Sequence, residues 1–375
     1  MFFSFYTNLD YQILILLVVC WFFLFTQIFY NLYFFRKLII YKKRKSNYRP
    51  NVSVIICAKN EYDNLKKNLK TILNQDYINY EVIVVNDQSN DNTKDLLNEY
   101  EKTYFRLKVV NIDDNVNHII GKKFALTLGI KSANYDHLLL TDADCYVDSN
   151  KWISSMTHNF VSSDIVLGYG AYKKEKGLLN KLIRFDTYTI AIQYFSYALR
   201  SLTYMGVGRN LAYKKSVFFN NKGFASHMQV SSGDDDLFIK EAAKKSNVQI
   251  EFSQNSHTLS QAKSSWKEWY SQKRRHLTTS PLYDNKIKFL LSFYSISQFL
   301  FLMTFILLLT NNVSYYLWGP LLTVKLFLIY LINYPLMKKL NCTDLFLLSP
   351  IYEIFNLIFQ SSLFIFSINN NHNKW

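Results

Sequence analysis

Long uncharged apolar runs at both ends of the chain are the feature that most constrains its fold. About 25 residues between Asp10 and Arg36 carry no charge and are mostly Leu, Ile, Phe and Val. A helix of about 20 apolar residues is long enough to cross a bilayer core of about 30 Å. We therefore predict a transmembrane helix near residues 11–34. The run lacks a small-residue cleavage site, which favours a retained anchor over a removed signal peptide.

Three further apolar runs lie toward the C-terminal end, at residues 289–310, 313–336 and 345–368. Together the runs predict one N-terminal and about three C-terminal transmembrane helices. Basic residues cluster between Arg36 and Lys45, and Lys338 and Lys339 follow the third run. Because cytoplasmic flanks of membrane spans are enriched in Lys and Arg, we expect the long segment between the first two runs to be cytoplasmic. Both termini would then lie outside.

Two ionisable residues interrupt the last two apolar runs. Lys325 lies inside the third run, and Glu353 follows Pro350 inside the fourth. A charge in a membrane span is costly unless it is paired or functional, and similar depths would allow these two side chains to pair. The alternative is that residues 345–368 lie partly in the membrane interface, with Glu353 facing lipid headgroups.

The chain therefore divides into an N-terminal anchor (1–35), a cytoplasmic domain (36–288), C-terminal transmembrane helices (289–368) and a tail (369–375). Its net charge is +15, and much of the positive charge lies near the ends of the apolar runs, which favours contact with membrane lipids and argues against nucleic-acid binding. The four cysteines show no zinc or disulfide spacing, which is typical of a reducing compartment.

The cytoplasmic segment alternates short apolar runs with stretches of helical period. The apolar runs at 52–58, 81–87, 107–112 and 137–144 are typical strands, and 65–73 and 122–132 are typical helices. This alternation predicts an α/β domain with a parallel sheet, in which ligands bind beyond the carboxyl ends of the strands. Asp142 and Asp144 lie at the carboxyl end of the run 137–144, and carboxylates are the ligands that Mg²⁺ or Mn²⁺ prefers when it is shared with a diphosphate.

Four ordered motifs resemble the family 2 glycosyltransferases. They are Val52-Ser-Val-Ile-Ile-Cys-Ala-Lys-Asn-Glu61, Val84-Val-Asn-Asp-Gln-Ser-Asn-Asp-Asn-Thr93, Gly121-Lys-Lys-Phe-Ala-Leu126 and Thr141-Asp-Ala-Asp144. The resemblance covers about residues 50–280. It implies a GT-A fold, which is a Rossmann-like nucleotide-binding domain, and inverting transfer from a nucleotide-diphosphate sugar, with a UDP-sugar favoured. It also implies a divalent cofactor, Mg²⁺ or Mn²⁺, and an acceptor at the membrane that is a lipid, a lipid-linked sugar or another cell-envelope glycan.

The resemblance assigns roles to the polar residues that follow the strands. Asp87 matches the aspartate that recognises the base, although the usual Asp-Asp pair is Asn86-Asp87 here. Glu61 matches the residue beside the ribose, and Lys122 matches a lysine near the diphosphate, where a cation offsets phosphate charge. Asp142 would face the nucleotide and Asp144 the metal.

A second acidic cluster, Asp234-Asp235-Asp236, precedes a stretch of helical period at 237–245. Helix capping accounts for one such residue. Three adjacent acids also repel one another, which can raise one pKa toward the range of a general base. The catalytic acids of the family fall here. We assign Asp235 as the base that deprotonates the acceptor hydroxyl and Asp234 as its support, with Asp236 as the alternative base.

The stretch 264–276 combines basic and aromatic residues just before the second apolar run. An amphipathic interfacial helix would have this composition. The stretch also resembles the Q-x-x-R-W motif of membrane synthases, which places Gln272, Arg275 and His276 at the donor diphosphate and the acceptor end. His276 stands where the motif has Trp, and the loss of that broad stacking surface disfavours processive polymer synthesis.

Three functions therefore compete at this point. A membrane-bound glycosyltransferase that makes single transfers is favoured, and a processive polysaccharide synthase is the close alternative. A non-catalytic membrane scaffold with a degenerate domain belongs to another class, and the carboxylates at positions 142, 144 and 235 argue against it.

Overall fold

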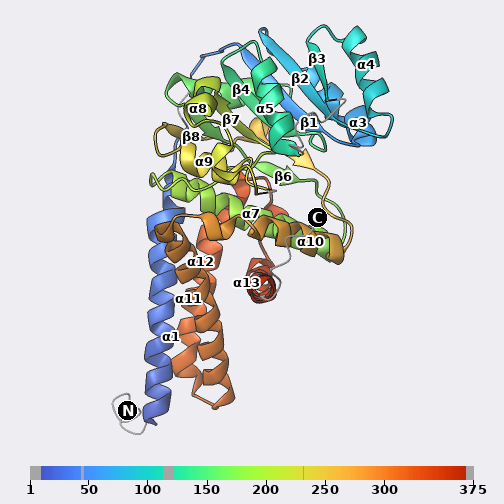
Figure 1. Cartoon of the computed structure of the whole chain (residues 1–375). Coiled ribbons are helices and arrows are strands. Elements are labelled where there is room, and N and C mark those ends of the chain that lie inside the picture. The colour runs from blue at the N-terminus through green and yellow to red at the C-terminus, as the bar shows by residue number, and fades with distance from the viewer. Residues whose placement is uncertain (1–9, 44–45, 113–120, 231, 369–375) are drawn as a thin grey trace. The chain divides into compact units, whose positions relative to one another are not determined.

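The computed structural model describes residues 10–43, 46–112, 121–230 and 232–368, and these form two compact units (Figure 1). One unit contains residues 42–283 and 339–341, and the other contains the apolar helices at both ends of the chain. The predicted tail, residues 369–375, lies outside the described residues.

The apolar unit is built from long helices with few charges. Its elements are α1 (Tyr11–Tyr30), η2 (Asn31–Phe35), α2 (Arg36–Ile40), α11 (Asn285–Thr310), α12 (Tyr315–Lys339), η7 (Thr343–Leu345) and α13 (Ser349–Ile368). Among the described residues, three helices are long and apolar enough to cross a membrane, namely Tyr11–Ile40, α11 and α12. The apolar run predicted at residues 345–368 forms α13, which is not among the three helices that meet the length and hydropathy expected of a membrane span. In Figure 1, α1, α11 and α12 run side by side, whereas α13 is viewed along its axis and so crosses them.

A polar network joins all four long helices of this unit. The Lys325 ammonium on α12 contacts Glu353 Oε1 on α13 at 2.5 Å and Gln27 Oε1 on α1 at 2.6 Å. Glu353 Oε1 also accepts a hydrogen bond from Gln298 Nε2 on α11, at 2.8 Å. The pairing expected from the sequence is therefore present, and it satisfies two charges that would be costly alone among apolar helices.

The second unit is an α/β domain around a seven-stranded sheet in the order β3-β2-β1-β4-β7-β5-β8. Its strands are β1 (Val52–Ala58), β2 (Tyr80–Asp87), β3 (Leu107–Ile112), β4 (His137–Asp142), β5 (Ile165–Leu167), β7 (Leu211–Lys214) and β8 (Val248–Ile250). A separate parallel pair joins β6 (Gly170–Tyr172) to β9 (Thr258–Ser260).

Helices cover both faces of this sheet. They are α3 (Tyr62–Leu73), α4 (Thr93–Thr103), α5 (Lys122–Ser132), α6 (Trp152–Thr157), α7 (Leu178–Ala198), α8 (Lys215–Asn220), α9 (Asp236–Ala242) and α10 (Trp266–Leu277). Short 3₁₀ turns are η3 (His158–Val161), η4 (Ala225–His227), η5 (Gln254–Ser256) and η6 (Ser280–Leu282). Alternate strand residues such as Val54 and Val84 pack with Leu69 of α3 and Leu97 of α4 in one core.

The prediction of a parallel sheet holds for β1 to β4 only. Strands β1, β2, β3 and β4 pair in parallel, but β7 runs antiparallel to both β4 and β5. The sheet is therefore mixed. The strands that the sequence pattern missed have three or four residues each, too few to show a period in the sequence.

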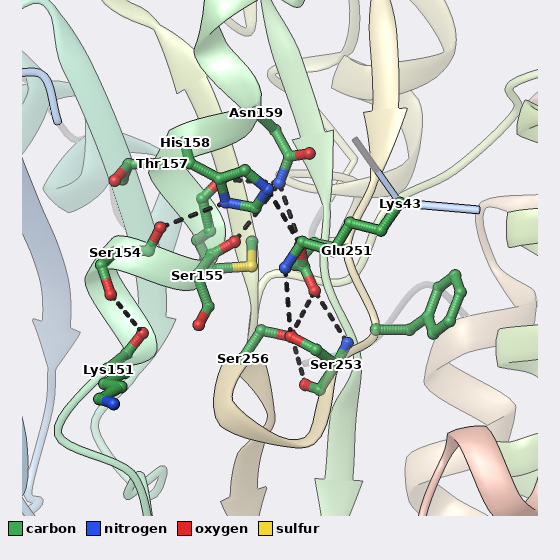
Figure 2. Close-up of polar contacts among 12 residues, drawn as sticks. Lys43, Lys151, Ser154, Ser155, Thr157, His158, Asn159, Glu251, Ser253 and Ser256 are labelled. Carbon is green, nitrogen blue, oxygen red and sulfur yellow. Dashed lines mark hydrogen bonds and ion pairs between the residues drawn. The ribbon is translucent and has the colours of Figure 1, made fainter. Parts of the chain in front are cut away.

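A buried carboxylate holds the start of this domain (Figure 2). Glu251 is 1% exposed and accepts hydrogen bonds from Asn159 Nδ2 at 3.1 Å and from the backbone N–H and hydroxyl of Ser253. The Lys43 ammonium lies 2.6 Å from Glu251 Oε2. Lys43 follows the first apolar helix by three residues, so this ion pair fixes the chain where it enters the domain.

Candidate active site

The predicted nucleotide-binding residues meet at one edge of the sheet. Strand β1 lies between β2 and β4, and the register places Cys57 beside Val85 and Asp142. Because the three strands are parallel, their carboxyl ends deliver Glu61, Asp87 and Asp142 to the same edge.

The thiol of Cys57 lies among the charges of this edge. Burial raises the pKa of Cys57 to about 12, and Lys122, Asp234, Asp142 and Asp87 all act on the thiol electrostatically. Residues from five separate segments of the chain therefore lie around one small cavity, whose lining includes Cys57, Lys122, Asp142, Gly208 and Asp234.

Asp144 does not continue the fourth strand, contrary to the prediction of a strand over 137–144. Strand β4 ends at Asp142, and a turn follows in which Cys145 N donates to Asp142 O at 3.1 Å. Asp144 therefore lies in this turn, and its carboxylate is near enough to that of Asp142 for the two charges to interact. Burial and the charge of Asp142 raise the pKa of Asp144, whereas Arg209 lowers it.

Glu61 lies near the same two aspartates. It immediately precedes α3, and its carboxylate accepts a hydrogen bond from Asn64 Nδ2 at 2.6 Å. Burial raises the pKa of Glu61, and the charges of Asp144 and Asp142 act in the same direction. The structure thus brings Glu61, Asp142 and Asp144 into one region of surplus negative charge.

Lys122 lies between the two acidic motifs. Its ammonium is 2.8 Å from Asp142 Oδ1 and 2.9 Å from Asp234 Oδ2. Burial would lower the pKa of Lys122, but the nearby carboxylates of Asp142, Asp234 and Asp235 raise it well above its ordinary value. Lys122 is therefore fully protonated. Its ammonium, which lies between the two carboxylates, can also bind a phosphate oxygen.

The three adjacent acids have three different sets of partners. Asp234 pairs with Lys122, which lowers its pKa although burial acts the other way. Asp235 accepts hydrogen bonds from the N–H of Gly208 and the N–H of Asp236, both at 2.7 Å. Burial, Asp234 and Asp236 raise the pKa of Asp235 to about 7. This is the range in which a carboxylate both ionises and accepts a proton at neutral pH.

Asp236 is bonded within the protein. It is 7% exposed and accepts hydrogen bonds from the hydroxyls of Thr279 at 2.5 Å and Tyr283 at 2.7 Å, and from the N–H of Leu237. A buried carboxylate that accepts three hydrogen bonds from the protein stabilises the fold and is not available to a substrate. The geometry therefore favours Asp235 over Asp236 as a base.

Gln272 of α10 reaches the site through an aromatic ring. Its amide donates to the hydroxyl of Tyr172 at 3.2 Å, and the guanidinium of Arg209 lies over the same ring, 4.3 Å from its centroid. Arg209 Nη1 also donates to Ser260 Oγ at 3.0 Å. Since Arg209 acts on Asp144, this stack lies beside the predicted metal ligand.

Arg275 and His276 both have exposed side chains at the end of α10. Although the side chain of His276 reaches solvent, nearby protein atoms disfavour the charged imidazole and lower the pKa of His276; the charges of Lys273 and Arg275 act in the same direction, and Asp234 opposes the shift. The imidazole is therefore neutral at pH 7. The interaction with Asp234 places His276 near the acidic cluster, whereas within the described part of the chain the side chain of Arg275 makes no hydrogen bond or ion pair with these acids.

A divalent cation fits the charge of this site. Among the described residues, no group of three or more His, Cys, Asp or Glu side chains is arranged to enclose a metal. Mg²⁺ in phosphate sites takes one or two carboxylates and completes its shell with phosphate oxygens and water. Asp144 and Asp142, whose mutual repulsion raises the pKa of Asp144, have the donor chemistry for such a shared ion.

Four residues outside the predicted motifs contribute to the site. They are Arg209, Gly208, Tyr172 and Thr279. None of them belongs to a motif from which a role in the site could be predicted. The sequence feature that could have indicated two of them is the run Gly206-Val-Gly-Arg-Asn210, because a glycine allows another group to approach the backbone closely. A Cβ atom at Gly208 would lie 3.4 Å from both Asp235 Oδ2 and Lys122 Nζ.

The chain is similar to known glycosyltransferases. Residues 53–219 match the family model described as Glycosyl transferase family 2. A poly-beta-1,6-N-acetyl-D-glucosamine synthase of Staphylococcus epidermidis is 30% identical over 116 residues, which is 31% of this chain and 27% of that protein. A 4,4'-diaponeurosporenoate glycosyltransferase of Staphylococcus haemolyticus is 34% identical over 119 residues, which is 32% of this chain and 31% of that protein. The chain thus spans less than a third of the length of these curated relatives.

A solved structure is similar over nearly the whole chain. It is a mannosyltransferase from Pyrobaculum calidifontis in complex with GDP-Man and Mn²⁺, with a TM-score of 0.58, 16% identity, and coverage of 91% of this chain and 99% of that one. At this identity the likeness concerns the fold alone. It confirms the predicted fold class, a GT-A domain combined with apolar helices near both ends.

Proposed function

The chain carries a family 2 glycosyltransferase domain over residues 53–219, and from this premise we propose that it is an inverting glycosyltransferase bound to a membrane. The donor is a nucleotide-diphosphate sugar, with UDP-sugars favoured, and the acceptor is a lipid, a lipid-linked sugar or another cell-envelope glycan. The observation that carries the proposal is the position of Asp235, whose pKa is about 7, within the cluster that also holds Lys122 and Asp142.

The proposed reaction forms one bond and breaks one bond. The acceptor oxygen bonds to the anomeric carbon of the donor sugar, and its proton passes to a carboxylate oxygen of Asp235. The bond between that carbon and the diphosphate oxygen breaks, and its electron pair leaves with the nucleoside diphosphate. A positioned base typically contributes 10²–10⁴-fold to such a rate.

The leaving group is stabilised by positive charge. Lys122 would contact the diphosphate between Asp142 and Asp234, and Arg275 would supply a second cation from α10. A divalent cation at Asp144, when bound, would offset further charge on the diphosphate. Glu61 and Asp87 would hold the ribose and the base, and Gln272 and His276 would face the acceptor end.

The proposed location is the cell membrane, with the catalytic domain in the cytoplasm. Support comes from the three helices long enough to cross a membrane and from the basic residues that flank them. Similarity to a poly-N-acetylglucosamine synthase favours a second candidate, a processive polysaccharide synthase. His276 lacks the broad stacking surface of the Trp in the motif, which argues against a processive synthase, and product length on a gel separates the two.

The test measures release of nucleoside diphosphate by the detergent-solubilised full chain, across UDP- and GDP-sugars with Mg²⁺ or Mn²⁺. We expect donor-specific release that falls at least 10²-fold in Asp235→Asn, while the variant still binds the donor. Asp95→Asn is the matched control, because Asp95 is exposed on α4 and lies outside the site.

Two results would contradict the proposal. Equal release by the wild type and Asp235→Asn would remove Asp235 from the reaction. Absence of donor binding by the wild-type protein would favour the non-catalytic scaffold.

A further inference from the structure

Two consecutive lysines open helix α5, and their side chains diverge. The N-terminus of a helix repels cations, so Lys122 and Lys123 both occupy an unfavourable position. Lys122 reaches the carboxylates of the site, as described above. Lys123 is only 6% exposed, and its ammonium donates to the backbone carbonyls of His227 at 2.5 Å and Val230 at 2.8 Å.

The two carbonyls belong to the segment that leads into the acidic cluster. Helix α8 ends at Asn220 and α9 begins at Asp236, and among the described residues between them η4 is the only helical turn. Gly233, with φ of +97°, then turns the chain into Asp234. A segment with so little regular structure needs contacts from elsewhere to hold one conformation. Lys123 supplies a charge-assisted contact from α5, the same helix that carries Lys122.

A second contact holds the same segment, and its side chain, Ser226, adds no positive charge near the acidic cluster. The hydroxyl of Ser226 donates to Glu241 Oε2 at 2.6 Å, on the side of α9. Ser226 also contacts His227 Nδ1 at 2.9 Å. This contact provides a control, because removing it loosens the segment but leaves the charge beside the acids unchanged.

The ammonium of Lys123 also contributes electrostatically. The charged and titratable groups around it are Asp234, Asp235 and Asp236 on one side, and His227 with Glu241 on the other. Burial lowers the pKa of Lys123, and the three aspartates oppose that shift, so the side chain acts on each acid in return.

We propose that Lys123 is a positioning residue, which fixes residues 227–230 and so holds Asp234 and Asp235 in place beside Lys122. The inference rests on the proposed function and deepens it. The two lysines have different roles: Lys122 binds the negatively charged diphosphate of the donor, and Lys123 orders the backbone that leads to the catalytic base.

The test compares Lys123→Met, Lys123→Arg and Ser226→Ala in the full chain, using initial rates over a range of pH and the binding of free nucleoside diphosphate. In Lys123→Met we expect kcat to fall at least tenfold while diphosphate binding changes less than threefold. The acid limb of the pH profile should move to higher pH, because loss of a nearby cation raises the pKa of Asp235. Lys123→Arg should keep the limb within about 0.3 pH units of the wild type, and so should Ser226→Ala.

The readings separate a positioning role from a purely structural one. Unchanged kcat in Lys123→Met would overturn the proposal, and so would a loss of kcat with an unmoved acid limb. If Lys123→Met does not fold, Lys123→Gln replaces it under the same criteria, because its amide keeps an N–H donor without charge. The proposed function is tested separately. If the wild type transfers sugar and Asp235→Asn does not, the proposed function stands, even if the Lys123 variants contradict the positioning role.

Discussion

The pH dependence of transfer gives a sharp test of the acidic cluster. Asp235 must be ionised to accept a proton, and its pKa is about 7. About one tenth of the enzyme would be active at pH 6 and about nine tenths at pH 8. We therefore expect kcat/KM to rise roughly tenfold between these values, whereas a carboxylate with an ordinary pKa would give a flat profile over this range.

Two neighbours should move this profile in opposite directions. Asp234→Asn removes a negative charge that raises the pKa of Asp235, so the acid limb should move to lower pH. Lys122→Met removes a positive charge that lowers this pKa, so the limb should move to higher pH. For charges about 6 Å apart in partly solvated surroundings, each displacement is on the order of one pH unit.

The assay follows nucleoside-diphosphate release at subsaturating donor between pH 5 and 9. Both variants are expected to be slow, and the position of the limb is the quantity compared. A limb near pH 4 in the wild type, or displacement of both variants in the same direction, would refute the assignment of Asp235 as the base.

Three further outcomes are expected. Asp144→Ala should abolish metal-dependent donor binding, measured by calorimetry with and without Mn²⁺, and undiminished binding would exclude Asp144 as the ligand. Lys325→Met should lower the free energy of unfolding in detergent by about 3 kcal/mol because Glu353 loses its partner, and adding Glu353→Met should restore most of it. Glu251→Ala should lower the stability of the domain by about 2 kcal/mol, because Lys43 loses a buried partner. A melting temperature equal to the wild type would contradict either stability prediction.

The sequence predicts the half of the domain in which secondary structure is long and regular. Strands β1 to β3 match the apolar runs closely, and α5 matches its predicted bounds of 122–132. The polar residues that follow these strands meet at one edge, because parallel strands share a direction. The position of Asp142 beside Cys57 follows from this register.

The other half of the site depends on contacts between distant segments. The hydrogen bond from Gly208 to Asp235 joins residues 27 positions apart, and the bond from Thr279 to Asp236 joins residues 43 positions apart. Neither contact has a period or a motif in the sequence. For the same reason the ordering role of Lys123 could not be read from its place in a helix.

The ion pair between Lys325 and Glu353 has a consequence for how the protein is made. The chain emerges from the ribosome N-terminus first, so Lys325 reaches the proposed membrane before Glu353 does. Gln27, already present on α1, contacts the ammonium and can shield it during that interval. Addition of α13 then brings Glu353 to the ammonium and completes the neutralisation within the apolar unit.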